Sequence, residues 1–225
     1  MQNRISSLLQ IERGITAIIG SGGKTTLMYA LANELSAEGS VILCTSTHIR
    51  IPEEYPLVTG GKKELVNMLS GHRIVCAGTL TETGEKLTAP AVTFEELSAL
   101  ADHVLVEADG AKGLPLKAHA AHEPVIPSGS RSVILVVGAD GLGKPVKEAC
   151  HRFEIWAALA QTAVEGTVTP EGEARVILTE NLAGRIFINK AESAEEKRQA
   201  EALAALLPFL TVMGSLRQGV FTICH

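Results

Sequence analysis

The stretch Ile15-Thr16-Ala17-Ile18-Ile19-Gly20-Ser21-Gly22-Gly23-Lys24-Thr25-Thr26 runs from an apolar segment into a glycine-rich loop that ends in Lys-Thr-Thr. Glycines allow backbone N–H groups to converge on an anion, the following helix directs its positive end at the same point, and a lysine adds a mobile charge. A hydroxyl directly after the lysine can bind Mg²⁺. The stretch therefore predicts a strand, a phosphate-binding loop and a helix in that order.

The spacing of this loop differs from the common G-x-x-x-x-G-K-[ST] pattern. That pattern would place its first glycine at Ile18, and counting from Gly20 instead gives a loop two residues shorter. The alternative is a glycine-rich turn that only packs a helix against a strand. Such a turn gives no reason for a lysine and two consecutive hydroxyls at the start of the helix.

The short loop resembles that of the Mur peptide ligases, whose pattern is G-T-x-G-K-T-T. This resemblance implies that Lys24 binds the β and γ phosphates of a nucleotide, that Thr25 binds Mg²⁺, and that Gly22 and Gly23 supply backbone amides. The nucleotide-binding residues expected in the loop are Gly20, Ser21, Gly22, Gly23, Lys24, Thr25 and Thr26.

The composition favours a cytoplasmic protein with one α/β domain over residues 1–225. Hydrophobic residues make up 46% of the chain and few are aromatic, which suits a buried parallel sheet of Val, Ile and Leu. The net charge of −5 argues against a general nucleic-acid-binding role. No apolar run is long enough to cross a membrane, and the first twenty residues lack the order of a signal peptide. The four cysteines stand far apart without a C-x-x-C pair, so we expect reduced thiols.

Strands alternate with helices along most of the chain. After the first strand, further strands are expected at 41–44, 73–77, 103–110, 132–137, 186–188, 209–213 and 220–223. Helices are expected from the glycine loop to residue 39 and at 62–69, 93–101, 148–161, 170–178 and 194–207, with a hairpin turn at 81–85. This order predicts an α/β fold of the P-loop NTPase type, with a mostly parallel central sheet flanked by helices on both faces.

Two acids end the apolar strand that begins at His103. A nucleotide hydrolase needs a carboxylate at the carboxyl end of a neighbouring strand, where it reaches Mg²⁺ directly or through water. Glu107 and Asp109 are two residues apart and share one face of a continuing strand. We expect Glu107 to hold the metal together with Thr25, and Asp109 to orient a water or an acceptor hydroxyl. With Lys24 they form the predicted catalytic set; the alternative is that Asp109 only begins a turn.

Lysines and hydroxyls in two other segments are candidates for ligand binding. Lys112 and Lys117 stand in a long loop after the acids and are expected to hold an anionic second substrate or a γ-phosphate; the alternative is an exposed loop with ordinary surface lysines. His119 and His122, also in this region, do not have a convincing metal-binding spacing. The hydroxyls at 45–47 follow the second strand and either bind Mg²⁺ or phosphate or cap a turn.

A late tetrapeptide, Asn189-Lys190-Ala191-Glu192, resembles the N-K-x-D guanine-recognition element of GTP-binding proteins. The resemblance implies that Asn189 and Lys190 contribute to a nucleotide site. Glu192 replaces the aspartate and is one methylene longer, so the choice between ATP and GTP stays open.

Taken together, these residues resemble the YqeC family, described as selenium-dependent molybdenum hydroxylase accessory proteins. The matching pieces are the loop at 20–26, the block at 106–117, the segments at 122–127 and 136–145, His151-Arg152, and Asn189-Lys190. The resemblance implies a role in the maturation of a molybdenum hydroxylase or its cofactor.

We therefore expect an Mg²⁺-dependent nucleoside triphosphate-binding protein that hydrolyses ATP or GTP as a maturation factor. One alternative is a kinase or ligase that acts on a small molecule, and another is a non-catalytic nucleotide-binding scaffold. A side hypothesis gives Cys44 or Cys150 a role with reactive selenium, against the more ordinary role of a buried thiol.

Overall fold

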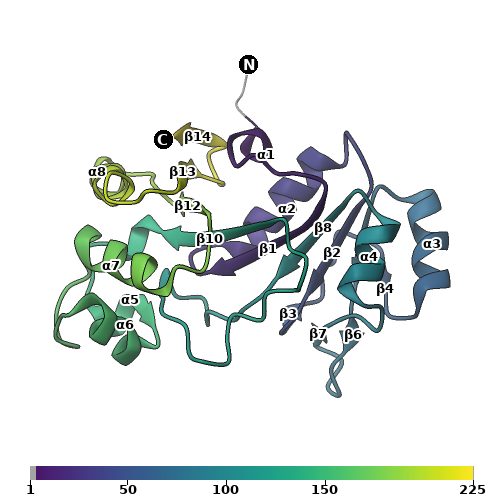
Figure 1. Ribbon diagram of the computed structural model, residues 1–225, viewed down its shortest axis with the longest axis horizontal. Helices are drawn as coiled ribbons and strands as arrows, with labels where there is room; N and C mark the ends of the chain where they lie inside the picture. Colours follow the sequence, from purple (N-terminus) through teal and green to yellow (C-terminus); the bar gives the residue numbers. More distant parts are fainter. Residues whose placement is uncertain (1–3, 225) are drawn as a thin grey trace.

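The computed structural model describes residues 4–224, and a nine-stranded sheet runs through it (Figure 1). All neighbouring strands in this sheet are parallel except the last pair, β13 and β14. In spatial order the strands are β14 (Val220–Ile223), β13 (Leu210–Ser215), β12 (Arg185–Asn189), β10 (Ser132–Gly138), β1 (Gly14–Gly20), β8 (His103–Glu107), β2 (Val41–Thr45), β5 (Ile74–Ala77) and β4 (Leu57–Val58).

Strand β1 lies in the middle of the sheet, between β8 and β10. Its register pairs Ile18 with Glu107 on one side and Gly20 with Val136 on the other. Because parallel strands end at the same edge of a sheet, the glycine loop after β1 and the acids at the end of β8 are brought together.

Alternating residues of the central strands face two different layers of helices. Ile18, Leu105 and Phe187 pack on one side with helices α1 (Ile5–Leu8) and α2 (Lys24–Leu35). The opposite side is covered by α3 (Lys62–Gly71), α4 (Phe94–Leu100), α5 (Val146–Ala149), α6 (Phe153–Ala160), α7 (Pro170–Glu180) and α8 (Ala194–Ala204). This alternation follows from the two-residue repeat of a strand.

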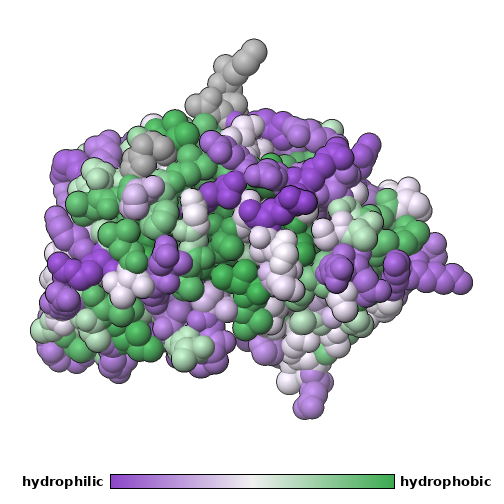
Figure 2. Space-filling view, in the orientation of Figure 1, coloured by the Kyte–Doolittle hydropathy of each residue, from purple (hydrophilic) through white to green (hydrophobic). Residues whose placement is uncertain are grey.

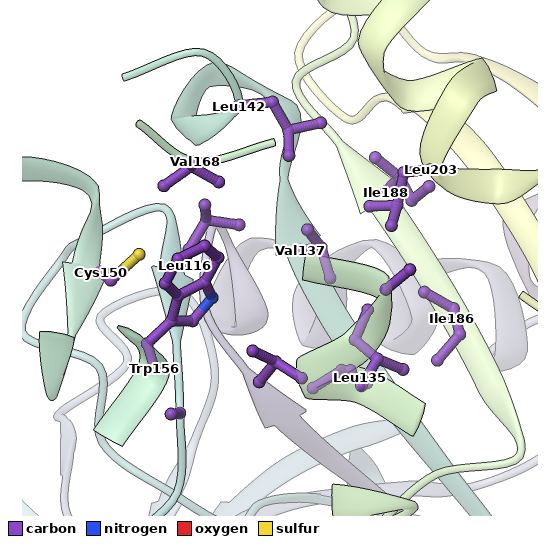
Figure 3. Packing of buried hydrophobic residues seen from close by; sticks show 14 of the residues in the cluster. Leu116, Leu135, Val137, Leu142, Cys150, Trp156, Val168, Ile186, Ile188 and Leu203 are labelled. Atoms are coloured by element: carbon purple, nitrogen blue, oxygen red, sulfur yellow. The ribbon is translucent and has the colours of Figure 1, made fainter. Parts of the chain in front are cut away.

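The largest buried cluster lies between the sheet and the later helices. Trp156 of α6 and Leu203 of α8 point toward the same layer as Leu135 and Ile186 of the sheet (Figure 3). Trp156 is fully buried, and its indole N–H donates to Glu173 of α7 at 2.6 Å. The late helices are therefore anchored to the sheet by one continuous apolar layer.

Two small sheets lie outside the main one. One has three strands in the order β3 (Ile49–Arg50), β7 (Lys86–Thr88) and β6 (Thr79–Leu80), and in Figure 1 it lies below the main sheet. The other joins β9 (Leu116–Lys117) to β11 (Cys150–His151) in parallel. A short 3₁₀ helix, η1 (Ala139–Gly141), follows β10.

The surface is mixed in character. Hydrophilic residues form a band near α2, whereas hydrophobic residues gather near β14 (Figure 2). Val220 and Ile223 on this edge strand are 60% and 46% exposed. Within residues 4–224 no helix combines the length and the apolar character that crossing a membrane requires.

The fold confirms the predicted parallel sheet with helices on both faces. The hairpin around residues 81–85 and the helix begun by Thr93 are also confirmed, with Thr93 and Glu96 forming a reciprocal capping box. The single helix expected at 148–161 is wrong. The chain leaves the helix at Cys150-His151 to pair with β9, and Arg152 has a φ of 60°, so a second helix begins only at Phe153.

Candidate functional site

The glycine loop between β1 and α2 packs so closely that side chains are excluded. Gly22 has a φ of 82°, and a Cβ there would lie 2.4 Å from the backbone nitrogen of Gly138. Gly23 has a φ of 127°, and a Cβ there would lie 2.6 Å from Asn189 Nδ2. Left-handed backbone and close approach both require glycine, as expected for a loop that presents its amides to an anion.

Lys24 is the first residue of α2, and its side chain is only 5% exposed. Its Nζ donates to the Gly20 carbonyl at 2.9 Å and lies 3.0 Å from Asp109 Oδ1 and 3.7 Å from Glu107 Oε1. The structure therefore brings the loop lysine and the two acids together. Oxygen atoms of Gly20, Asp109 and Glu107 thus surround the ammonium group beside the loop.

Thr25 and Glu107 form a second contact at this edge. The Thr25 hydroxyl donates to Glu107 Oε2 at 2.7 Å, and the Thr45 hydroxyl donates to the Glu107 carbonyl at 2.7 Å. Burial raises the pKa of Glu107, although the Lys24 charge and the Thr25 hydrogen bond partly offset this rise. The side chains of Thr25 and Glu107 thus present hard oxygen donors at one point.

Asp109 is completely buried and joins several charged groups. Its Oδ2 accepts from the Gly20 backbone N–H at 2.9 Å and lies 3.2 Å from Lys117 Nζ and 2.8 Å from His119 Nε2. Burial alone would raise the pKa of Asp109, but the His119 hydrogen bond and the charges of Lys24 and Lys117 outweigh it and lower the pKa to about 2. The carboxylate therefore stays ionised across the physiological range.

The other ring nitrogen of His119 extends this network to α7. His119 Nδ1 lies 2.7 Å from Glu180 Oε2. Burial opposes protonation of the ring, yet the hydrogen bonds with Asp109 and Glu180 raise the pKa of His119. Lys117, whose side chain is fully buried, also pairs with Glu123 at 3.1 Å, and Arg152 donates to Glu123 at 2.5 Å. A buried charge network therefore fixes the loop that follows β8.

A cleft of about 920 Å³ opens in front of the glycine loop. Lys24, Thr25 and Glu107 line it at one end, and Lys112 lines it from the loop after β8. Lys117 does not line this cleft, because it lies within the buried network below. The two lysines that the sequence placed together in a substrate site are thus separated into an exposed and a buried position.

A second cavity, of about 360 Å³, lies on the other side of the loop and shares Gly23, Thr26 and Lys190 with the cleft. Asn189 lines it, but its amide is already engaged, donating to the Gly22 carbonyl at 2.8 Å and accepting from the Leu216 N–H at 3.1 Å. Asn189 therefore ties the glycine loop to the end of β13.

Glu192 also lines the second cavity. Its carboxylate accepts from the Ser215 hydroxyl at 2.8 Å and from Arg217, and Lys190 pairs with Asp140 at 3.0 Å. The late Asn-Lys element thus lies beside the phosphate loop, although 165 positions separate it from Lys24 in the chain (189 − 24).

Several site residues belong to no local chemical motif. The spacing of His119 and His122 is not convincing for a metal site, and only the family resemblance of the segment 122–127 and of His151-Arg152 points to Glu123 and Arg152. Arg50 and Lys86 reach the cleft from the small sheet of β3 and β7, which only the tertiary structure brings there.

No cysteine of residues 4–224 lines the cleft or the second cavity. Cys44, Cys76 and Cys150 are buried, free thiols, and burial raises the pKa of each. Among residues 4–224 no group of three His, Cys, Asp or Glu side chains is arranged to hold a metal ion.

Comparisons with known proteins identify the family to which the chain belongs. The family model described as YqeC protein matches residues 16–154, which include the glycine loop, the acids of β8 and Arg152. The chain is also 32% identical over 162 residues to a protein of Escherichia coli (strain K12) named "Uncharacterized protein YqeC". That match covers 68% of this chain and 63% of the relative, so less than two thirds of the relative's length is spanned. With the family match extending over more than half of its length, the chain belongs to the YqeC family.

Proposed function

We propose that this protein binds a nucleoside triphosphate with Mg²⁺ and hydrolyses it. The observation that carries the proposal is the position of Lys24, whose ammonium lies 2.9 Å from the Gly20 carbonyl and 3.0 Å from Asp109 at the mouth of a glycine loop. A buried lysine at a helix start, beside backbone amides that glycine leaves accessible, matches the electrostatic needs of a triphosphate.

The residues present fit an Mg²⁺ ion. Thr25 and Glu107 supply hydroxyl and carboxylate oxygens, the donor type that Mg²⁺ prefers, and few protein ligands are needed because phosphates and waters complete its shell. Asp109 Oδ1 is buried and has no hydrogen bond among residues 4–224 beyond its ion-pair contact with Lys24. When bound, the metal would neutralise charge on the β and γ phosphates.

The roles of the charged residues follow from their surroundings. Lys24 stabilises negative charge that develops on the β–γ bridging oxygen and the γ oxygens. Asp109, with a pKa of about 2, is too weak a base to remove a proton efficiently near neutral pH. Its role is to hold Lys24 in place, because Asp109 is completely buried and does not line the cleft in which a water or an acceptor hydroxyl would lie.

The second cavity provides a place for the nucleotide base. It adjoins Gly23 and Thr26 of the phosphate loop, and the Glu192 carboxylate lies on its wall. A carboxylate accepts hydrogen bonds from base N–H groups, which both guanine and adenine carry. The base preference is therefore a matter for direct comparison of GTP and ATP.

The biological role that we propose is that of an accessory factor in the maturation of a selenium-dependent molybdenum hydroxylase. It rests on the family resemblance of the sequence motifs. A small-molecule kinase or ligase is the second candidate, favoured by the size of the cleft and its basic lining. A non-catalytic scaffold would bind the nucleotide at the same loop without turnover.

The variant Lys24→Ala tests the proposal. We expect it to lose phosphate release from ATP or GTP while circular dichroism shows an intact fold. Lys197→Ala, an exposed lysine of α8 without an ion pair among the described residues, is the matched control and keeps full turnover. Wild-type turnover in Lys24→Ala would refute the assignment of the loop.

A further inference from the structure

The cleft in front of the glycine loop has a strong excess of positive charge. Its charged lining comprises six cationic side chains and two acidic ones, although the whole chain has a net charge of −5. The cations are Lys24, Arg50, Lys86, Lys112, Arg152 and Lys190, and the acids are Glu107 and Glu123. Like charges gathered in a concave site raise the local concentration of anions.

Three of these cations have no acidic partner in the part of the chain that the structure describes. Lys24, Arg152 and Lys190 each pair with a carboxylate, whereas no ion pair joins Arg50, Lys86 or Lys112 to an acid between residues 4 and 224. These three unpaired cations therefore line the cleft where the small sheet and the loop after β8 form its wall.

Arg50 and Lys86 stand directly opposite each other. They are register partners in the antiparallel pair of β3 and β7, and both line the cleft. Like charges directly opposite on neighbouring strands are destabilising. An anion bound between the two side chains would remove this repulsion.

The dimensions of the two cavities leave room for a second ligand. The proposed nucleotide extends from the loop into the separate cavity of about 360 Å³ beside Asn189 and Glu192. The part of the cleft that Arg50 and Lys86 line then stays outside the nucleotide site, in a cleft of about 920 Å³ in all. Sites for small molecules commonly measure about 300–1,000 Å³, so the remaining space suits a second substrate.

We propose that Arg50, Lys86 and Lys112 bind the phosphate or carboxylate groups of a small anionic second substrate, next to the γ-phosphate. This inference rests on the nucleotide binding in the proposed function, and it favours the second candidate activity, phosphoryl transfer to a small molecule, over hydrolysis. An oxygen of the substrate forms a bond to the γ-phosphorus while the bond to the β–γ bridging oxygen breaks, and the electron pair leaves with the nucleoside diphosphate. A carboxylate or phosphate oxygen brings no proton for a base to remove, so this transfer needs no general base.

Calorimetry with defined anions tests the site. The wild-type protein is first saturated with Mg²⁺ and the β,γ-imido analogue of ATP or GTP, and pyrophosphate or citrate is then titrated in separate arms. We expect at least one anion to bind; stronger binding of pyrophosphate indicates a phosphate-bearing substrate, and stronger binding of citrate a carboxylate-bearing one. The double variant Arg50→Gln/Lys86→Gln should bind that anion at least about tenfold more weakly.

The matched control is Lys63→Gln/Arg73→Gln, which removes the same charge from exposed positions outside the cleft. It should change anion binding by less than about twofold, since distant surface charges are screened. Lys112 lies on a different segment, so Lys112→Gln is an independent test if circular dichroism shows that the double variant is misfolded. It should also weaken anion binding.

Two results would overturn the inference: no anion binding by the saturated wild type, or equal binding by the double variant and its control. Failure of the imido analogue to bind the wild type would instead contradict the proposed function, so the two failures are distinguishable.

Discussion

Glu173 of α7 is a fully buried carboxyl group whose main partner is the indole N–H of Trp156, at 2.6 Å. Burial raises the pKa of Glu173 to about 7, although the Trp156 hydrogen bond partly opposes the rise and the Glu180 charge adds to it. The side chain therefore carries a proton in the folded protein under conditions in which an exposed glutamate is ionised. A single residue thus links the stability of the late helices to pH.

Between the unfolded pKa of 4.5 and the folded value of about 7, the folded protein binds more protons at Glu173 than the unfolded chain does. The free energy of unfolding therefore falls as the pH rises through this interval and levels off above it. We expect the free energy of unfolding of Glu173→Gln to match that of the wild type at pH ~5 and to be higher by on the order of 2 kcal/mol at pH ~8.

Urea unfolding at several pH values measures this difference. Glu201→Gln, an exposed glutamate of α8, is the control and should keep the wild-type pH dependence. A constant difference between Glu173→Gln and the wild type over the whole range would show that Glu173 does not titrate in it.

At the residue scale, the sequence predicted those parts of the site that form a local motif. Lys24, Thr25 and Glu107 were predicted together because a glycine loop and an acidic strand end are recognisable patterns. His119 was not, since its partners Asp109 and Glu180 are 10 and 61 positions away and only folding brings all three together. Arg50 and Lys86 were missed for the same reason.

At the element scale, the loop between β8 and β9 is held by a buried lysine. Lys117 Nζ lies 3.2 Å from Asp109 and 3.1 Å from Glu123 and donates to the Gly110 carbonyl at 2.5 Å. Removing one member of a buried ion pair leaves an uncompensated charge. The loop that carries Lys112 therefore depends on Lys117 for its position.

We expect Lys117→Met to lower the free energy of unfolding by about 3 kcal/mol, because Asp109 and Glu123 lose a cationic partner without a matching loss of volume. Denaturant unfolding at pH 7 measures the change. Lys112→Met, an exposed lysine of the same loop, should change stability by less than about 0.5 kcal/mol. Equal effects of the two substitutions would show that the buried network does not stabilise the loop.

Elements with strong periodicity were predicted well, and those decided by tertiary contacts were not. The apolar runs of β8 and β10 and the capping box at Thr93 specify their structures locally. The stretch from 148 to 161 reads as one helix by composition, yet pairing of Cys150 and His151 with Leu116 and Lys117 interrupts it. Helical propensity is a weak preference that tertiary contacts override.

At the scale of the whole molecule, the proposed nucleotide site joins parts of the chain that are distant in sequence. The glycine loop follows β1, whereas Asn189 and Leu216 come from the ends of β12 and β13. The Asn189 amide donates to Gly22 of the loop and accepts from the Leu216 N–H. A nucleotide that occupies the loop and the second cavity would contact both parts. Binding would therefore stabilise the entire fold and not only one loop.

Thermal unfolding with ligand tests this global coupling. At about one hundred times Kd, a ligand adds about 2.7 kcal/mol to the free energy of unfolding. For a chain of this size that corresponds to a rise in Tm of about 5–10 °C. We expect this rise with ATP or GTP in the presence of Mg²⁺ and a smaller one with EDTA, since Thr25 and Glu107 would then lack the metal.

Lys24→Ala should show little rise in Tm and Lys197→Ala a full one. The nucleotide that raises Tm at the lower concentration identifies the preferred base, and an unchanged Tm with both nucleotides would contradict a nucleotide site that spans the two parts of the chain.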